Sequence, residues 1–244
     1  MFFLFPGTML VYRWILIFAA VIPALILMVK VYSSDKIEKE SPRLLIRLVE
    51  AGILAALLAL IEEKVGQWLI RLLIPQDTEL FYLVLFFIVV GLSEESSKYL
   101  FMKKRTWDNP EFNYQYDGAV YALFTSLGFA LWENISYVLD YGFSTALVRA
   151  VTAIPGHASF GVFMGVFYGA AKRAEVHGDS QKSRLYRILG VVTATLMHGA
   201  YDYLATSETG SGSFWFFVYV VLLFIFAYRT VSRSSKNDKS LDAD

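Results

Sequence analysis

The sequence has no cysteine among its 244 residues. This absence excludes disulfide bonds, thiolate metal sites and a cysteine nucleophile. Charged residues are scarce as well, at 18% of the chain, whereas a soluble domain has about 25%. Its 22 basic and 22 acidic side chains cancel, so the charge gives no sign of a nucleic-acid partner. No internal repeat is visible either.

Long apolar runs take the place of these features. Hydrophobic residues make up 56% of the chain, and the runs approach the ~20 residues that cross ~30 Å of hydrocarbon. We therefore predict an all-α polytopic membrane protein with one helical domain, residues 1–231. Seven spans are expected, at roughly 9–31, 44–61, 79–100, 118–138, 148–171, 187–206 and 213–231. The second is the weakest, because Arg47 and Glu50 interrupt it.

Lysine and arginine are unevenly distributed between the spans. Of the 22 basic residues, 17 lie around positions 30–47, 103–105, 172–187 and 229–239. Apart from Lys98, which lies within the third predicted span, only Arg13, Lys64, Arg71 and Arg149 lie on the alternate segments. Because cytoplasmic loops are enriched in lysine and arginine, this pattern predicts an outside N-terminus and a cytoplasmic C-terminus. Residues 232–244 are polar and charged, so we expect a disordered cytoplasmic tail. The first span is long and lacks a small-x-small site after it, so we expect it to be retained rather than cleaved.

One polar cluster ends the apolar run of the third predicted span. It consists of Glu94, Glu95 and Lys98. On a helix Lys98 is one turn from both glutamates and can pair with either. A self-neutralising ion pair accounts for one carboxylate and leaves the other in need of a partner. Ionisable residues at this depth are costly and by default indicate a functional site.

Three further clusters lie in later spans. Glu133 and Asn134 are inside the fourth, and His157 follows Pro-Gly in the fifth. His198 and Asp202 are four residues apart in the sixth, so the aspartate can orient the imidazole. Each has a plain structural interpretation, since a single histidine on an apolar face is usually a packing residue. Together they favour a catalytic or ion-binding site, because two of the three histidines and several acids share one set of helices.

The residue types permit several functions. Two imidazoles and a carboxylate can bind Zn²⁺ and leave a position for water, while a separate glutamate accepts a proton. The set also permits a metal-free reaction, with a glutamate activating water and His or Asn stabilising the oxyanion. Chains of intramembrane acids and histidines also serve transporters and proton relays. A scaffold that assembles a partner enzyme is a third possibility.

Depth creates a conflict within this set. At ~1.5 Å per residue, Glu133, His157 and His198 lie roughly 9–12 Å from the outer end of their spans. Glu94 lies at about 21 Å if its helix is straight. Either the third span starts later, is tilted, or is broken near Gly91, or its glutamates belong to another site.

The order of the motifs resembles the PrsW family of intramembrane proteases. The match comprises Glu94-Glu95-x-x-Lys98, Phe129-x-x-x-Glu133-Asn134, Pro-Gly-His157-Ala and His198-Gly-x-x-Asp202, and it covers roughly residues 80–202, within a motif-bearing core at 79–206. Distant relatives are the type II CAAX prenyl endopeptidases and the gamma-secretase scaffold subunit Aph. The Aph likeness keeps the scaffold alternative open.

The resemblance implies a peptidase of the bacterial cytoplasmic membrane that makes the first cut in a single-span anti-sigma factor. It implies Glu94 and Glu95 as catalytic carboxylates and His157 as essential. Together with the residue chemistry, it leads us to expect Glu133, His157, His198 and Asp202 around a metal ion. We expect Asn134 to donate a hydrogen bond to the substrate backbone.

Overall fold

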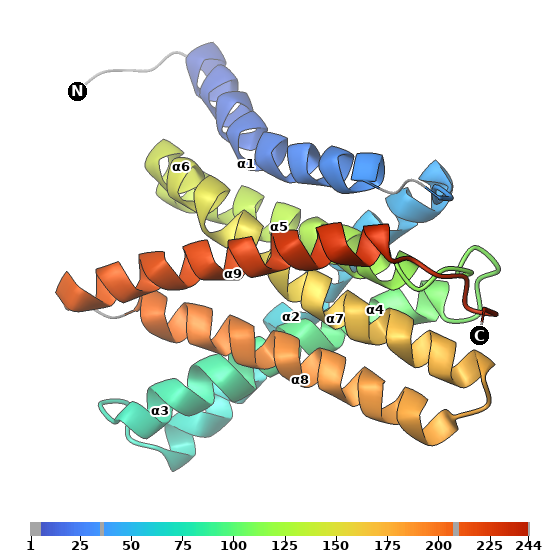
Figure 1. Cartoon of the computed structure of the whole chain (residues 1–244). Helices are drawn as coiled ribbons and strands as arrows, with labels where there is room; N and C mark the ends of the chain where they lie inside the picture. Colours follow the sequence, from blue (N-terminus) through green and yellow to red (C-terminus); the bar gives the residue numbers. More distant parts are fainter. Residues whose placement is uncertain (1–5, 35–36, 207–209, 244) are drawn as a thin grey trace.

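A computed structural model describes residues 6–34, 37–206 and 210–243, and over these residues the chain is helical (Figure 1). Its elements are α1 (Pro6–Ser34), α2 (Pro42–Leu73), α3 (Glu79–Leu83), a π-helix η1 (Val84–Leu92), α4 (Ser93–Thr106), α5 (Asp117–Tyr141), α6 (Phe143–Val151), α7 (Ala153–Val176), α8 (Ser180–Ala205) and α9 (Gly210–Lys236). The all-α prediction is confirmed.

Five helical stretches are long and apolar enough to cross a membrane. They are Leu10–Ser34, Pro42–Leu73, Glu79–Thr106, Phe143–Val176 and Gly212–Lys236. The seven-span count and the orientation remain predictions. The second predicted span, 44–61, is too short: α2 continues to Leu73, through the charged residues Glu62, Glu63 and Lys64.

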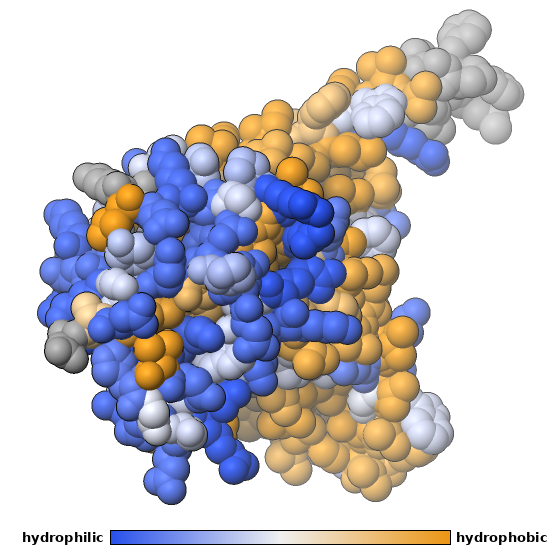
Figure 2. All heavy atoms as spheres, turned by 90° about the vertical axis from the view of Figure 1, so that its right-hand side faces the viewer, coloured by the Kyte–Doolittle hydropathy of each residue, from blue (hydrophilic) through white to orange (hydrophobic). Residues whose placement is uncertain are grey.

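The connections with most of the basic residues lie together at one end of the bundle. In Figure 1 this end is on the right, where α4, α7 and α9 finish and α2 and α8 begin. Hydrophilic side chains gather there and hydrophobic ones lie behind them (Figure 2). We refer to it as the basic end. The predicted orientation requires these basic connections to lie on one side of the membrane, and they do lie at one end of the bundle. Lys36, one of the 17 residues counted, is outside the described residues.

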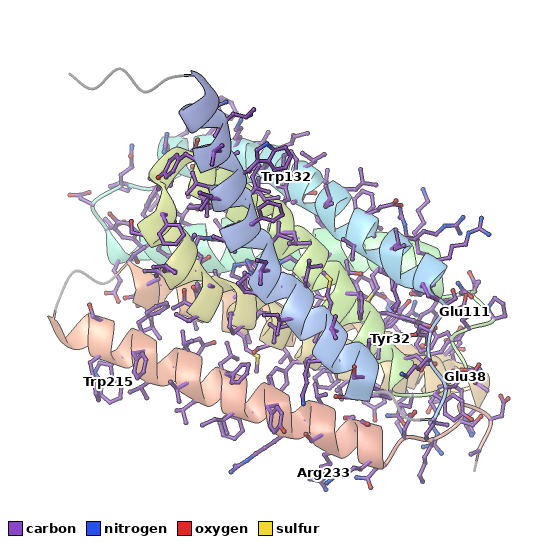
Figure 3. All side chains as sticks on the ribbon, turned by 90° about the horizontal axis from the view of Figure 1, so that it is seen from above. Tyr32, Glu38, Glu111, Trp132, Trp215 and Arg233 are labelled. Atoms are coloured by element: carbon purple, nitrogen blue, oxygen red, sulfur yellow. The ribbon has the colours of Figure 1, made fainter. Side chains whose placement is uncertain are left out.

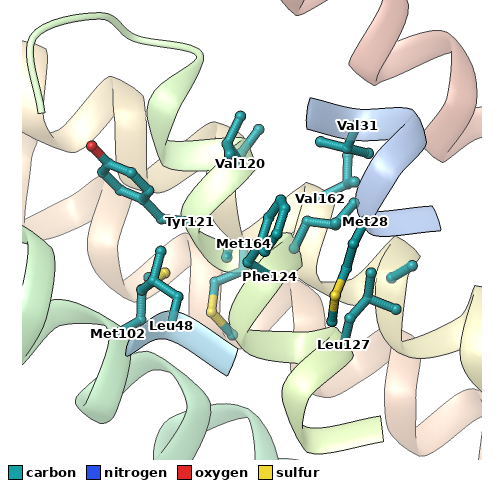
Figure 4. Close-up of a cluster of buried hydrophobic side chains, with 14 of the residues drawn as sticks. Met28, Val31, Leu48, Met102, Val120, Tyr121, Phe124, Leu127, Val162 and Met164 are labelled. Atoms are coloured by element: carbon teal, nitrogen blue, oxygen red, sulfur yellow. The ribbon is translucent and has the colours of Figure 1, made fainter. Parts of the chain in front are cut away.

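Helix α5 lies at the centre of the bundle and packs against α1, α2, α4, α6 and α7. Two of its close contacts require glycine. A Cβ atom on Gly52 of α2 would collide with the carbonyl oxygen of Thr125, and one on Gly118 would come within 2.5 Å of the Gly169 nitrogen on α7. Larger apolar side chains fill the remaining space (Figure 4), including Leu127, Met164 and Met102. This packing brings the polar residues of α5 and α7 to neighbouring levels.

The C-terminal segment differs from the predicted disordered tail. Residues 232–236 continue α9, and the chain then pairs with the α4–α5 connection. The Leu241 amide donates to the carbonyl of Asn113 at 2.8 Å, and the Gln115 amide donates to Lys239 at 2.9 Å. Leu241 itself is buried in the main core. Composition alone missed this arrangement because one apolar side chain anchors an otherwise polar segment. Asp244 lies outside the described residues.

A buried carboxylate lies beside this docked segment at the basic end. Glu40 precedes α2 and is only 5% exposed. Burial, followed by the nearby carboxylate of Asp117, raises the pKa of Glu40 to about 9. Glu111 adds to this repulsion, while its own oxygens accept bonds from the Ser41 amide and hydroxyl at 2.8 and 3.0 Å. Glu40 is therefore protonated near pH 7.

We expect this carboxyl group to make stability depend on pH. Because its folded-state pKa lies above the unfolded value of 4.5, its contribution is complete below about pH 4.5 and is lost as the pH rises through 9. Thermal unfolding in micelles should show a lower midpoint temperature at pH 9 than at pH 6. Glu40→Gln should reduce the corresponding difference in the free energy of unfolding by roughly 1–3 kcal/mol. Glu175→Gln, on the exposed end of α7, is the matched control. An unchanged pH slope in Glu40→Gln would contradict the assignment.

Candidate functional site

The π-helix η1 brings the paired glutamates to the level of the histidines. A π-helix bonds i to i+5, so it advances less along its axis per residue than an α-helix. Its nine residues directly precede Glu94 and Glu95 on α4. Gly91 and Gly199 allow η1 and α8 to approach, because a Cβ on Gly199 would lie 2.5 Å from the Phe87 ring. The third span is therefore not a straight α-helix, and Glu94 and Glu95 do meet the two histidines.

Lys98 lies at the centre of the polar cluster, with only 1% of its side chain exposed. Its Nζ donates to Glu95 Oε1 at 2.7 Å and to Glu94 Oε2 at 3.1 Å. The same atom is 3.2 Å from Nδ1 of His157 and 3.9 Å from the centre of the Phe129 ring. The pairing predicted within the motif is confirmed, and a histidine from α7 completes it.

The two ring nitrogens of His157 have different partners. An ammonium group can only donate, so Nδ1 of His157 accepts from Lys98 and Nε2 is the protonated nitrogen. Nε2 lies 2.8 Å from Oε2 of Glu133, which accepts its proton in a hydrogen bond. Glu133 also accepts a bond from Arg149 Nη2 at 2.7 Å. The imidazole is thereby fixed in one tautomer and orientation.

His198 approaches the glutamates from α8. Its Nδ1 lies 2.9 Å from Glu95 Oε1 and 3.7 Å from Glu94 Oε2. Because an ionised carboxylate only accepts, Nδ1 is the donor to Glu95. Nε2 lies 3.5 Å from Asp202 Oδ2, one helical turn away. The predicted His198–Asp202 pair is present.

Four side chains could hold a metal ion together. Glu94, Glu95, His157 and His198 each offer a ligand atom, and these atoms lie within 4.8 Å of one another. Oε2 of Glu95 is buried without a hydrogen-bond partner in the described residues, so it has acceptor capacity to spare. Two imidazoles and two carboxylates are donors that zinc accepts. By donor chemistry the set fits a divalent ion.

Charge balance supports the same fit. The ion-paired residues are four acidic side chains (Glu94, Glu95, Glu133, Asp202) and two permanent cations (Lys98, Arg149). With neutral imidazoles and ionised carboxylates, these six residues alone have two uncompensated negative charges, which is costly at membrane depth. A dication or two protonated imidazoles would compensate them. Glu62 and Glu63 on α2 lie nearby and are not in this count.

The arrangement differs from the predicted ligand set. Glu133 accepts a bond on the outer side of His157, and Asp202 lies 3.5 Å from the outer nitrogen of His198, both away from the four-residue group, whereas Glu94 and Glu95 are members of it. Asn134 also differs from expectation. Its side chain is buried, Oδ1 accepts from Arg149 Nε at 2.6 Å, and Nδ2 donates to the Ala20 carbonyl at 3.4 Å. A substrate backbone has no access to it there.

Two residues of the site were missed by the sequence analysis. Arg149 extends from α6 to Glu133 and Asn134, and its guanidinium packs 4.1 Å from the Tyr137 ring. Glu62 on α2 accepts a bond from the buried hydroxyl of Ser97 at 3.1 Å. The sequence analysis used Arg149 only in the count of basic residues, and Glu62 lies just past the predicted end of the second span at residue 61. One signal in the sequence could have revealed Arg149. Glu133 has no cation on its own helix, so it needs a positively charged partner from another one.

Aromatic rings surround this cluster. Phe160 stacks on His198 at 4.9 Å, and Phe129 lies 5.6 Å from His157. Glu133 and Asp202 keep 23% of their side chains exposed, whereas the central residues are almost fully buried. The central residues of the site are therefore buried, whereas Glu133 and Asp202 lie at its more exposed edge. Carboxylates and imidazoles in such a setting can activate water and stabilise developing charge.

The chain is similar to known proteins over most of its length. Residues 40–229 match a family described as PrsW family intramembrane metalloprotease. A protein named Protease PrsW from Oceanobacillus iheyensis is 34% identical, over 90% of this chain and 95% of that relative. Relatives with the same name from Clostridioides difficile and Bacillus subtilis are 31% and 32% identical, over 84% and 64% of this chain and 84% and 67% of their own. No solved structure gives a significant match. The chain therefore belongs to the PrsW family of intramembrane metalloproteases and is a multi-pass membrane peptidase.

Proposed function

We propose that this peptidase cleaves a single-span membrane protein of the anti-sigma-factor type, and that Glu94 is its general base. The observation that supports this most is the convergence of ligand atoms of Glu94, Glu95, His157 and His198, all buried, within 4.8 Å of one another. Acids distributed through the membrane depth would have suited a transporter instead.

The bonding of the two glutamates suggests different roles. Glu95 is held by both Lys98 and His198 and is fully buried. Glu94 has one close partner, Lys98 at 3.1 Å, and lies farther from His198. A general base needs a lone pair that water can reach, so Glu94 suits proton transfer. It would accept a proton from water and return it to the leaving amine.

Glu95, His157 and His198 are then the residues that would hold an ion, since catalytic zinc sites use three protein ligands. A bound zinc ion would supply Lewis acidity toward water and the scissile carbonyl. Lys98 cannot share these ligands with a divalent ion, so its flexible side chain would have to withdraw. Glu133 and Arg149 would keep His157 oriented, and Asp202 would do the same for His198.

The test uses purified protein in lipid bilayers with a single-span anti-sigma factor as substrate. We expect about one zinc ion per chain, loss of cleavage with a chelator, and recovery when zinc is returned. A single-span protein of equal span length but unrelated outer sequence is the control substrate. Undiminished cleavage after complete metal removal would eliminate the metal, and equal cleavage of both substrates would eliminate the anti-sigma-factor preference.

A further inference from the structure

A second cavity lies on the opposite side of α7 from the catalytic cluster. It has a volume of about 480 Å³ and is bounded by α1, α5, α7 and α9. On α7 it is lined by Ala158 and Ser159, the residues that follow His157. Its size lies within the range of small-molecule sites, ~300–1,000 Å³. None of the proposed catalytic residues lines it.

The cavity is a wedge between two helices that meet at one end only. The Ser235 hydroxyl on α9 donates to the Ser34 carbonyl on α1 at 2.7 Å, which closes the basic end. Figure 3 labels Tyr32 and Arg233 near this end, and α1 and α9 diverge as they run away from it. The walls are mainly apolar, including Leu27, Leu123, Val162 and Phe224.

The mouth of this wedge opens toward hydrocarbon. Neighbouring apolar side chains on α1 and α9 point away from the protein, with Ile26, Val29 and Phe226 exposed by 62%, 65% and 54%. In the hydrocarbon region of a bilayer, exposed apolar side chains such as these face lipid acyl chains. An apolar cavity that opens there is filled by an apolar chain rather than by water.

Two lysines lie at the basic end of the same cavity. Lys30 and Lys236 both line it and are solvent-exposed, and within the described residues neither forms an ion pair. The hydroxyls of Ser33 and Ser34 are engaged with carbonyls of their own helix, at 2.7 and 2.8 Å. The ammonium groups are thus the positively charged donors that line the cavity.

We propose that this wedge is a binding site for an anionic phospholipid of the cytoplasmic leaflet. An acyl chain occupies the space between α1 and α9, and the headgroup phosphate pairs with Lys30 and Lys236. The ligand must combine an apolar chain with an anion at one end, and it must be present in the bilayer beside the cytoplasmic loops. Anionic lipids meet all three requirements, and each nearby lysine strengthens their attraction.

Native mass spectrometry of the full chain, titrated with phosphatidylglycerol and phosphatidylcholine of identical acyl chains, tests the proposal. We expect phosphatidylglycerol to bind at least roughly tenfold more tightly, and Lys30→Gln/Lys236→Gln to abolish this preference. Lys104→Gln/Lys182→Gln is the control, because it removes the same charge from the basic end outside the cavity. An equal loss in both double variants, or no preference in the parent protein, would overturn the proposal.

A second variant separates the cavity from its charges. Val231→Trp fills the wedge while retaining both lysines, and it should lower binding of both lipids severalfold in protein that stays monodisperse. A single-span substrate peptide should leave the bound lipid in place. Displacement by the peptide would assign the wedge to the substrate and reject the lipid site. These measurements are independent of cleavage, so they succeed or fail separately from the proposed function.

Discussion

Glu95→Gln should abolish cleavage of a single-span substrate, with a rate loss of at least about 10³-fold. Two contacts of Glu95 depend on its charge, with Lys98 at 2.7 Å and with His198 at 2.9 Å, and its second oxygen has no hydrogen-bond partner in the described residues. Glutamine preserves the volume but removes the charge and one acceptor. The expected loss therefore comes from ligand and ion-pair chemistry and not from a cavity.

Reconstituted protein and a quenched-fluorescence substrate provide the rate, and size-exclusion profiles report whether the variant inserts and folds. Glu175→Gln is the control for the same chemical change at an exposed position. Glu94→Gln, measured alongside, tests the division of roles. If Glu94→Gln is inactive but still binds zinc while Glu95→Gln loses the metal, the proposed roles stand; the reverse pattern would exchange them. Normal cleavage by Glu95→Gln would remove this residue from the mechanism.

The sequence favoured a meeting of these residues, because each is individually unfavourable in a bilayer, but the depth of Glu94 left open that the glutamates belong to another site. Glu94, Glu133 and His198 lie on three different spans, and burial of their charge is tolerable only if they pair. Motif order provided the same conclusion independently. What neither provided was the level at which α4 joins the others, since a nine-residue π-helix has no distinctive composition in the run from Val84 to Leu92.

The remaining differences share a physical cause: the partner was far away in the chain. Asn134 is satisfied by Arg149 from α6 and by a carbonyl of α1. Neither contact can be predicted from the residues next to Asn134 in the sequence. The second span was predicted to end at residue 61, yet the helix continues and Glu62 is satisfied by Ser97 across the α2–α4 contact. Leu241 likewise anchors the C-terminal segment only because a core surface is available to it. Tertiary contacts decided each of these positions.

Lys98→Met should be the most destabilising single change in the site, by about 3–5 kcal/mol. Lys98 is almost completely buried between Glu94 and Glu95, and methionine would fill its space without its charge. The two carboxylates would then repel each other at membrane depth, where water cannot compensate them. Thermal and denaturant unfolding in micelles with chelator present would measure this loss, with Lys104→Met as the exposed control.

The cause can be separated from a packing defect by a second substitution. If uncompensated charge is responsible, Glu95→Gln in the Lys98→Met background should recover part of the lost stability, because one buried negative charge is removed. Additive losses would instead indicate packing. Zinc gives an independent check on the same variant: an ion that takes the ligands now engaged by the ammonium should stabilise Lys98→Met more than the parent protein. Equal stabilisation of the two proteins would mean that Lys98 and the ion do not compete, and the ion would then have to bind elsewhere than among Glu95, His157 and His198.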